Sequence, residues 1–332
     1  MLTHDIGGLK VWADPANGAI MLGNKAASQS ALSLSRPHDN IEIATVAVPN
    51  GAPDFEGVFA PLGTNGRVVR LRFWGTQATP GFASLLADAT DPGPPETTLD
   101  IAHDPDGRRT LWRDGSPVFS DQPKKGTERT FDPLAELLIA ACGPGRTAAL
   151  VHGSAVSWRG ATILLAGRSG AGKSTLAAAL CADGGAYVCD DTLVLRADDG
   201  AALPVRCRPS FKAGTWSLLE PLFPALTQQP EFFKKGEPYR HLPDAPWARH
   251  PVPLDAVIFP LYAPQATPEL ISLAPEEVVL MLAKGGFWTS GEMLGPALDA
   301  LPVHRAFALR HDGIDSAMIR LREIVETVRM PI

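Results

Sequence analysis

A run of nine consecutive residues has the composition and order of a phosphate-binding loop. It comprises Gly167, Arg168, Ser169, Gly170, Ala171, Gly172, Lys173, Ser174 and Thr175. Glycines at these positions allow backbone N–H groups to turn inward around phosphate oxygens, and Lys173 places a cation at the β and γ oxygens. Ser174 occupies the position from which a hydroxyl ligates Mg²⁺. The alternative is a glycine-rich turn with a chance Lys-Ser pair.

The segments on either side of the loop supply the context that such a loop requires. Residues 161–166 form an apolar run suited to a buried strand, and residues 176–180 predict the start of a helix. The positive end of that helix dipole would face the phosphates. We therefore predict that the chain binds a nucleoside triphosphate, with ATP and Mg²⁺ as the expected ligands; another phosphoryl donor stays open.

Two adjacent carboxylates follow the next apolar run. Asp190 and Asp191 come directly after residues 186–189, at the end of a predicted strand. Metal-holding aspartates occupy this place beside phosphate loops. One carboxylate could hold the metal with Ser174 while its neighbour accepts a proton from an attacking hydroxyl, and Asp191 is narrowly the preferred base. The alternative is an Asp-Asp turn or a helix cap.

A histidine interrupts the apolar strand that precedes the loop. His152 lies within residues 149–156, and a turn at residues 158–160 leads back into the strand of the loop. Taken alone, such a histidine is more often a hydrogen-bonded core residue than a catalytic one. Its position close to the loop favours a role in orienting the carboxylate pair.

Together these motifs resemble the HPr kinase/phosphorylases and their relatives. The resemblance covers residues 147–196 strongly and continues weakly toward residue 282. In that family the histidine and the aspartate pair lie beside the γ-phosphate and supply the catalytic base and a metal contact. The resemblance implies an α/β P-loop kinase domain with Asp191, Asp190, His152 and Lys173 as catalytic residues, and with Ser174 and Asp190 at the metal.

Two departures separate the chain from the bifunctional enzymes of that family. Thr175 stands where those enzymes usually have glutamate, and their downstream glycine-rich signature with an acidic metal ligand has no counterpart after Asp191. The resemblance therefore does not extend to the phosphorylase activity. The chain looks closer to divergent HPr-kinase-like proteins of bacterial peptide-modifying pathways, including those that phosphorylate a serine of a lasso peptide precursor.

The first part of the chain predicts a separate, smaller domain rich in β-structure. Predicted strands at residues 9–12, 41–48, 68–74 and 98–102 alternate with turn signals such as Asn17-Gly18, Asn65-Gly66 and Asp106-Gly107. This pattern is typical of a small antiparallel domain. The polar run 121–127 looks like a boundary, and Asp132 caps a predicted helix over 133–140. We assign residues 1–125 to the β-rich domain and 126–332 to the kinase domain, which a helix over 316–325 closes.

Composition limits the classes of partner. The 332 residues carry a formal net charge of −6, so no general attraction to nucleic acid or to an anionic membrane is expected. The four cysteines show no paired spacing and have apolar neighbours, which favours buried thiols in a reducing compartment. No targeting segment or spanning run is apparent. A cytoplasmic protein is expected, and homo-oligomerisation stays open.

Basic residues after the aspartate pair are candidates for the acceptor site. Arg206, Arg208 and Lys212 form one group, and residues 232–240 form an aromatic-flanked second group. Either could clamp the triphosphate, neutralise developing charge or hold an acidic peptide, while solvated loop charge is the alternative.

The sequence thus favours an ATP- and Mg²⁺-dependent kinase that transfers the γ-phosphate to a hydroxyl, with serine of a protein or peptide as the expected acceptor. A small-molecule kinase is one rival function. A nucleotide-gated binding module with slow hydrolysis is another, from a different class.

Overall fold

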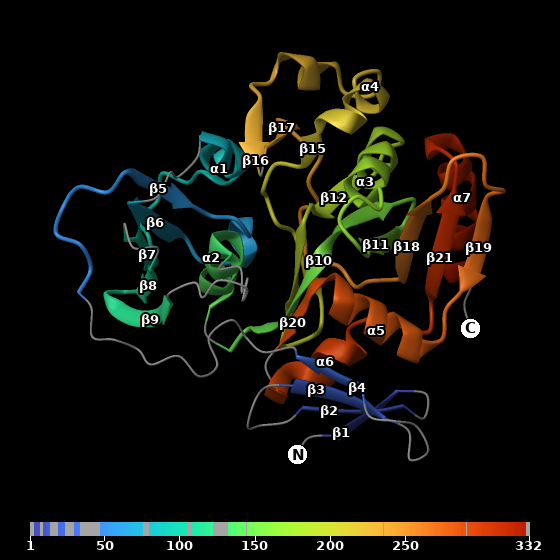
Figure 1. The fold of residues 1–332 in the computed structure, drawn as a ribbon, viewed down its shortest axis with the longest axis horizontal. Coiled ribbons are helices and arrows are strands. Elements are labelled where there is room, and N and C mark those ends of the chain that lie inside the picture. The colour runs from blue at the N-terminus through green and yellow to red at the C-terminus, as the bar shows by residue number, and fades with distance from the viewer. Residues whose placement is uncertain are drawn as a thin grey trace.

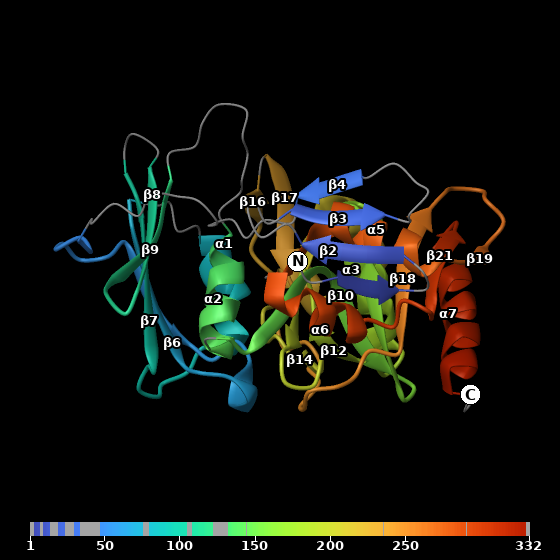
Figure 2. The same ribbon diagram turned by 90° about the horizontal axis from the view of Figure 1, so that it is seen from below.

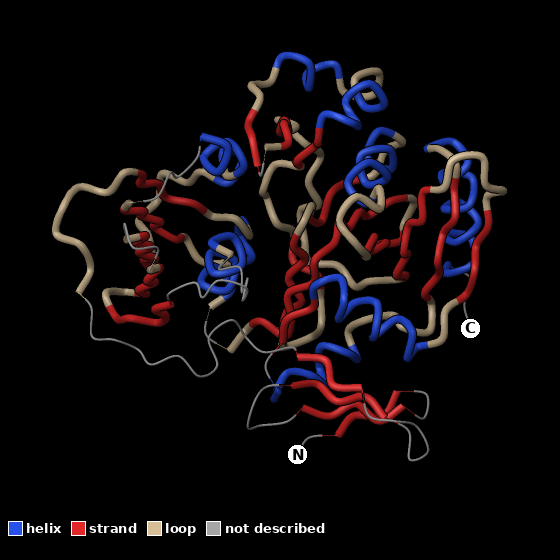
Figure 3. Tube along the Cα trace, in the orientation of Figure 1, coloured by secondary structure: helices blue, strands red, loops and turns tan. Residues whose placement is uncertain are grey.

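The computed structural model describes residues 3–6, 9–13, 19–23, 30–33, 47–75, 80–104, 108–121, 132–143, 145–234, 236–289 and 291–329. Within these ranges the chain has a mixed α/β fold built on four sheets (Figure 1, Figure 3). The predicted turns Asn17-Gly18 and Asp106-Gly107, most of the predicted strand 41–48 and residues 122–127 of the polar run lie outside the described residues.

A large central sheet carries the glycine loop. Its strands are β10 (Thr147–Trp158), β11 (Ala161–Ala166), β12 (Ala186–Cys189), β13 (Thr192–Arg196), β14 (Ala202–Leu203), β18 (Ala256–Tyr262), β19 (Glu269–Ser272), β20 (Phe287–Thr289) and β21 (Ala306–His311). The main order is β14-β13-β10-β11-β18-β21-β19, and β12 and β20 also pair with β10. Both β11–β18 and β18–β21 are parallel pairs, whereas β10 and β11 form an antiparallel hairpin.

Helices cover both faces of the central sheet (Figure 1, Figure 2). One face carries α3 (Lys173–Ala182) and α7 (Ile314–Arg329), and the other carries α5 (Pro275–Gly286) and α6 (Leu294–Asp299). Successive side chains of a strand point to opposite faces. Accordingly Ile163 and Leu165 of β11 pack in one apolar cluster with α3 and α7, whereas Leu164 packs in another with α5. All of β11 is buried, which explains its unbroken apolar sequence.

A second sheet lies beside the central one. It contains β5 (Phe55–Phe59), β6 (Val69–Trp74), β7 (Thr97–His103), β8 (Arg109–Arg113) and β9 (Ser116–Asp121), with α1 (Pro80–Leu85), η1 (Gly63–Asn65) and η2 (Ala87–Ala89) in its connections. Its pairs are antiparallel except β6–β7, which is parallel. The expectation of a wholly antiparallel domain is therefore wrong for this pair, because α1 and η2 carry the chain back across the sheet before β7 begins.

Helix α2 (Pro133–Cys142) lies between the second sheet and the central sheet (Figure 1, Figure 2). Asp132 caps it as predicted, because its side chain accepts a hydrogen bond from the Leu134 backbone N–H at 3.0 Å. The buried Leu137 and Leu138 belong to the same apolar cluster as Leu71 of β6. Because one apolar cluster joins both sheets to α2, this helix holds the two sheets together.

Two smaller sheets complete the described fold. The N-terminal sheet is an antiparallel meander of β1 (Thr3–Ile6), β2 (Leu9–Ala13), β3 (Ala19–Gly23) and β4 (Ser30–Ser33), next to α6 (Figure 1). The predicted strand 9–12 is thus confirmed. The other small sheet has the order β15-β17-β16, with β15 (Ser210–Lys212), β16 (Phe232–Lys234) and β17 (Glu237–His241), beside η3 (Ala213–Thr215), α4 (Trp216–Leu219) and η4 (Pro224–Gln228); η5 (Gly291–Met293) precedes α6.

The region predicted as one β-rich domain therefore contains two separate sheets, over residues 3–33 and 55–121. The predicted boundary near residue 125 falls outside the described residues and stays a prediction. Along the described chain, each helix is too short or too polar to cross a lipid bilayer. The four cysteines are buried and unpaired, as their apolar neighbours indicated.

Candidate functional site

The glycine loop connects the end of β11 to the start of α3, in the predicted order of strand, loop and helix. Its backbone takes positive φ at Gly167 (121°), Gly170 (82°) and Gly172 (93°). Residues that carry a Cβ rarely adopt such backbone angles, so these three positions require glycine. The spacing of glycines in the sequence is thus explained by the local backbone path.

Lys173 begins α3 and is buried, with 7% of its surface exposed. Its Nζ donates hydrogen bonds to the backbone oxygens of Gly167 at 3.0 Å and Arg168 at 3.1 Å, so the ammonium lies inside the loop. Burial lowers the pKa of Lys173, and the nearby carboxylates of Asp191 and Asp190 oppose that shift. A buried cation that hydrogen bonds to neutral carbonyl oxygens would be stabilised further by an anion placed in the loop.

Asp190 is buried and its carboxylate is held from several directions. Ser154 on β10 donates from Oγ at 2.6 Å, and the backbone N–H of Ser210 donates at 3.1 Å. Ser174, the residue after the loop lysine, also lies near this carboxylate, and its hydroxyl opposes the rise in the pKa of Asp190. Burial raises the pKa of Asp190, the charge of Asp191 adds to the increase, and the hydrogen bonds oppose it. The result is a rigid carboxylate at the N-terminus of α3.

Asp191 differs from its neighbour in almost every respect. Its φ is +72°, so the chain turns between the two aspartates and the carboxylates point differently. Its side chain is 51% exposed, and its Oδ1 lies 3.4 Å from Nδ1 of His152. The Asp191 backbone oxygen accepts a hydrogen bond from the Gly153 N–H at 3.0 Å, which fixes the turn against β10. The chain therefore bends at the pair, and the bend separates the two carboxylates.

His152 is not a core residue in the structure. Its side chain is 26% exposed and reaches the carboxylate of Asp191. It lies on the β10 segment that pairs with the start of β13, two residues before Ser154. Because alternate residues of a strand share a face, His152 and Ser154 reach Asp191 and Asp190 from the same side.

These groups line one large cleft of about 1500 Å³. The cleft extends from the glycine loop to the second sheet's helices and to the small sheet. Polar or charged lining residues include Asp132, His152, Lys173, Ser174, Asp190, Asp191, Lys212, Lys234 and Glu237. Apolar lining residues include Phe82, Ile139 and Trp288.

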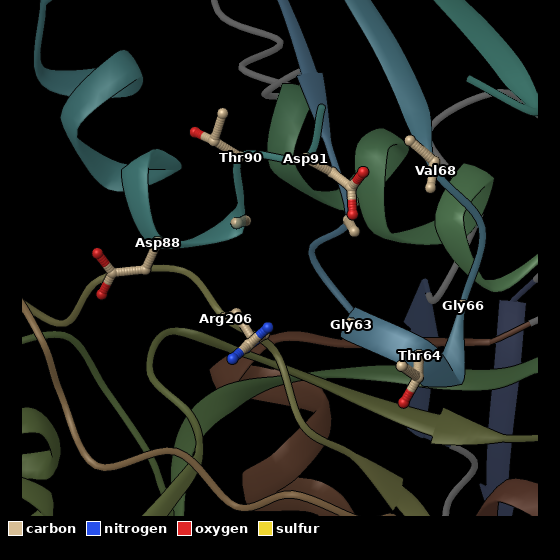
Figure 4. Close-up of a pocket in the computed structure, with 10 residues that line it drawn as sticks. Gly63, Thr64, Gly66, Val68, Asp88, Thr90, Asp91 and Arg206 are labelled. Carbon is tan, nitrogen blue, oxygen red and sulfur yellow. The ribbon is translucent and has the colours of Figure 1, made fainter. Parts of the chain in front are cut away.

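The three basic residues proposed for the acceptor do not act as one group. Lys212 lines the cleft, where its ammonium pairs with Glu237. Arg208 instead donates to Asp88 at 2.6 Å, and both side chains are largely buried, so this pair ties the chain after β14 to η2. Arg206 lines a separate hollow of about 270 Å³ with Gly63, Thr64 and Asp91 (Figure 4). Sequence proximity therefore does not bring Arg206 and Arg208 to the cleft.

The structure adds residues that sequence reasoning missed. Ser154 and Ser210 hold Asp190, and only the pairing of distant strands brings them there. Asp132 was recognised as a helix cap, yet it also lines the cleft. Burial raises the pKa of Asp132, and the nearby charge of Asp191 contributes. The sequence around Asp132 identifies a helix cap, but nothing in it indicates that this residue also lines the cleft.

The Ser174 hydroxyl and the Asp190 carboxylate beside the loop are oxygen ligands of the type that Mg²⁺ takes from proteins. Mg²⁺ prefers oxygen ligands and usually takes one or two carboxylates with substrate phosphates and water completing its shell. Ser174 and Asp190 offer such a pair. The described residues hold no group of three or more His, Cys, Asp or Glu side chains that could form a closed metal site.

Comparison with known proteins finds only a distant structural similarity. No family model matches the sequence. No curated protein matches it either. Among solved structures, the chain is similar to the Hpr(Ser) kinase/phosphatase from Coxiella burnetii, at 13% identity and a TM-score of 0.26, over 54% of this chain and 95% of that one. This is a distant structural relation, so the functional argument rests on the site itself.

Proposed function

We propose that the protein is an ATP- and Mg²⁺-dependent phosphotransferase that moves the γ-phosphate to a hydroxyl, with serine of a protein or peptide as the acceptor. The observation that carries the proposal is the convergence of three groups on one cleft. These are the positive-φ glycine loop with its buried Lys173, the rigid Asp190 beside Ser174, and the exposed Asp191 beside His152.

The loop and Lys173 would bind the phosphates. Glycine conformations let backbone N–H groups face an anion, and the α3 N-terminus adds its dipole. The Lys173 ammonium, now bonded to loop carbonyls, would also meet the β/γ oxygens and stabilise charge during transfer. Ser174 and Asp190 would hold Mg²⁺, which neutralises phosphate charge when bound.

The contrast between the aspartates supports a division of their roles. Asp190 is immobilised by Ser154 and Ser210, as a metal ligand needs to be. Asp191 is exposed to the cleft, where it could accept the proton of an attacking hydroxyl. His152 would orient Asp191 through the contact at Nδ1. We therefore assign Asp191 as the base.

The size of the cleft supports a peptide or protein acceptor. Small-molecule pockets usually enclose about 300–1,000 Å³, whereas this cleft of about 1500 Å³ would hold the triphosphate and leave further room for an acceptor. Its walls combine apolar side chains such as Phe82 and Trp288 with charged ones such as Lys212, as a peptide with mixed side chains requires. A closed pocket for a metabolite would be smaller.

A mass-shift screen tests the proposal. Purified protein, Mg²⁺ and ATP are incubated with a serine-containing peptide library and, separately, with a metabolite library. A gain of one phosphoryl group on peptides supports the proposal. Phosphorylation of metabolites alone would point to a small-molecule kinase, and tight nucleotide binding without any transfer would point to a nucleotide-gated module.

A further inference from the structure

Beyond the catalytic cleft, an aromatic and a histidine side chain lie together beside the glycine loop. Tyr262 ends β18 and His311 ends β21, and these two residues are direct partners in the parallel pairing of the strands. Their rings are 5.7 Å apart between centroids, with planes inclined by 50°. The Tyr262 side chain is strongly exposed, at 58%, whereas His311 is only 4% exposed.

His311 has an unused polar atom that faces the loop. Its Nδ1 lies 3.0 Å from the backbone oxygen of Gly313, so Nδ1 carries the proton and Nε2 is left as an acceptor. Among the described residues, this buried Nε2 finds no hydrogen-bond partner. A Cβ placed on Gly172 would lie 4.0 Å from it, so the atom is directly beside the last glycine of the loop.

Strand alternation places both side chains on the face that carries α3. Ile258 of β18 and Leu309 of β21 pack in the apolar cluster that contains α3 and α7, whereas Phe259 packs on the other face. Tyr262 is four residues after Ile258 and His311 is two after Leu309, so each shares its neighbour's face. The pair therefore lies on the side of the sheet where α3 and its glycine loop begin.

The nucleoside of a nucleotide bound at the loop would lie near Tyr262 and His311. In the proposed site the acceptor would lie at Asp190, Asp191 and His152, which belong to the β10 side of β11. The nucleoside would then extend from the loop toward the opposite side, where β18 and then β21 follow. Ligands of open α/β sheets lie at the carboxyl ends of the strands, and Tyr262 and His311 are the last residues of theirs.

We propose that Tyr262 and His311 form the nucleoside subsite, with the base stacked on the Tyr262 ring and an amino or hydroxyl group of the nucleoside donating to His311 Nε2. This inference rests on the proposed nucleotide-binding function and extends it to a specific recognition surface. An exposed tyrosine offers a stacking platform for any base. A buried acceptor adds a requirement for a donor, which inorganic polyphosphate lacks.

Calorimetric titration with two probes tests the subsite separately from the loop. The probes are β,γ-imido-ATP and inorganic tripolyphosphate, each with Mg²⁺, added to the full chain. Tyr262→Ala should weaken binding of β,γ-imido-ATP by about tenfold and leave tripolyphosphate unchanged. Tyr262→Phe, which keeps the ring, should bind both probes like the wild type.

Matched variants complete the design. Leu261→Ala is the control, because Leu261 is a similarly exposed neighbour on the other face of β18 and should change neither affinity. His311→Gln keeps an acceptor and should retain most of the affinity that His311→Leu loses, with melting temperatures recorded to verify folding. Equal wild-type affinity for both probes, or equal weakening of both by Tyr262→Ala, would overturn the subsite alone. Wild-type protein that binds neither probe would overturn the nucleotide function and the subsite together.

Discussion

The two walls of the cleft are built on different principles. On the wall of the glycine loop, Lys173 and Asp190 are buried and held in place, Lys173 by loop carbonyls and Asp190 by Ser154 and by the backbone of Ser210. On the wall formed by the small sheet, Lys212 and Glu237 pair in the open, with 57% and 60% of their side chains exposed. Buried charges in fixed positions have strong, directed fields, whereas exposed pairs contribute little energy and adapt easily. We infer that one wall performs the chemistry and the other accommodates the acceptor.

The largest effect is expected from the loop lysine. Lys173→Ala should reduce phosphoryl transfer by at least about a thousandfold, because Lys173 is the loop cation that lines the cleft, whereas the other loop cation, Arg168, is exposed and does not line it. Lys212→Ala is the matched control on the opposite wall and should change the rate by only a few-fold, mainly through the KM of the acceptor. Steady-state rates for both variants measure this, and equal losses would contradict the contrast between the walls.

Within the loop wall, the aspartates should fail in different ways. Asp190→Asn removes a metal ligand and should raise the Mg²⁺ concentration needed for half-maximal rate. Asp191→Asn removes the base and should lower the rate by about 10²–10⁴-fold even at saturating Mg²⁺. Titration of Mg²⁺ against rate for each variant separates the two roles. Identical curves for both variants would rule out the division of labour.

His152→Ala should have a smaller effect on the rate, on the order of a hundredfold, because the histidine acts through Asp191. Since its side chain is partly exposed and outside the apolar clusters, the melting temperature should change little. Nucleotide affinity should also stay near the wild-type value. Melting temperature, nucleotide affinity and turnover on one preparation check this. A strongly destabilised variant with full turnover per folded molecule would return His152 to a purely structural role.

The smallest effect concerns stability. Folding raises the pKa of Asp190. The protonated side chain therefore contributes its full stability at pH values below the carboxyl pKa of the unfolded chain. That contribution is lost as pH rises through the pKa of the folded state. The asparagine in Asp190→Asn does not titrate. Without nucleotide or metal, the free energy of unfolding of this variant should therefore increase relative to that of the wild type as pH rises, by on the order of 1 kcal/mol. Thermal melts between pH 4 and 8 measure the difference. A constant difference across that range would show that Asp190 is not perturbed.

The sequence was informative where the structure is local. The loop glycines, the strand before them and the helix after them were all predictable, because a positive φ demands glycine and an unbroken apolar run demands burial. The cap at Asp132 could also be predicted from the sequence, since a cap and its helix are contiguous. The parallel β6–β7 pair was not, because strand direction depends on the connection between the strands as well as on their side-chain pattern.

The sequence by itself determined which residues could bind phosphate and that two carboxylates follow them. Only the tertiary structure decided that Asp190 is buried under Ser154 and Ser210 while Asp191 is exposed beside His152. It also directed Arg208 to Asp88, 120 positions away, and not to the cleft. The physical reason is that backbone conformation is set by neighbouring residues, whereas burial, charge pairing and pKa are set by segments that meet only when the sheets assemble.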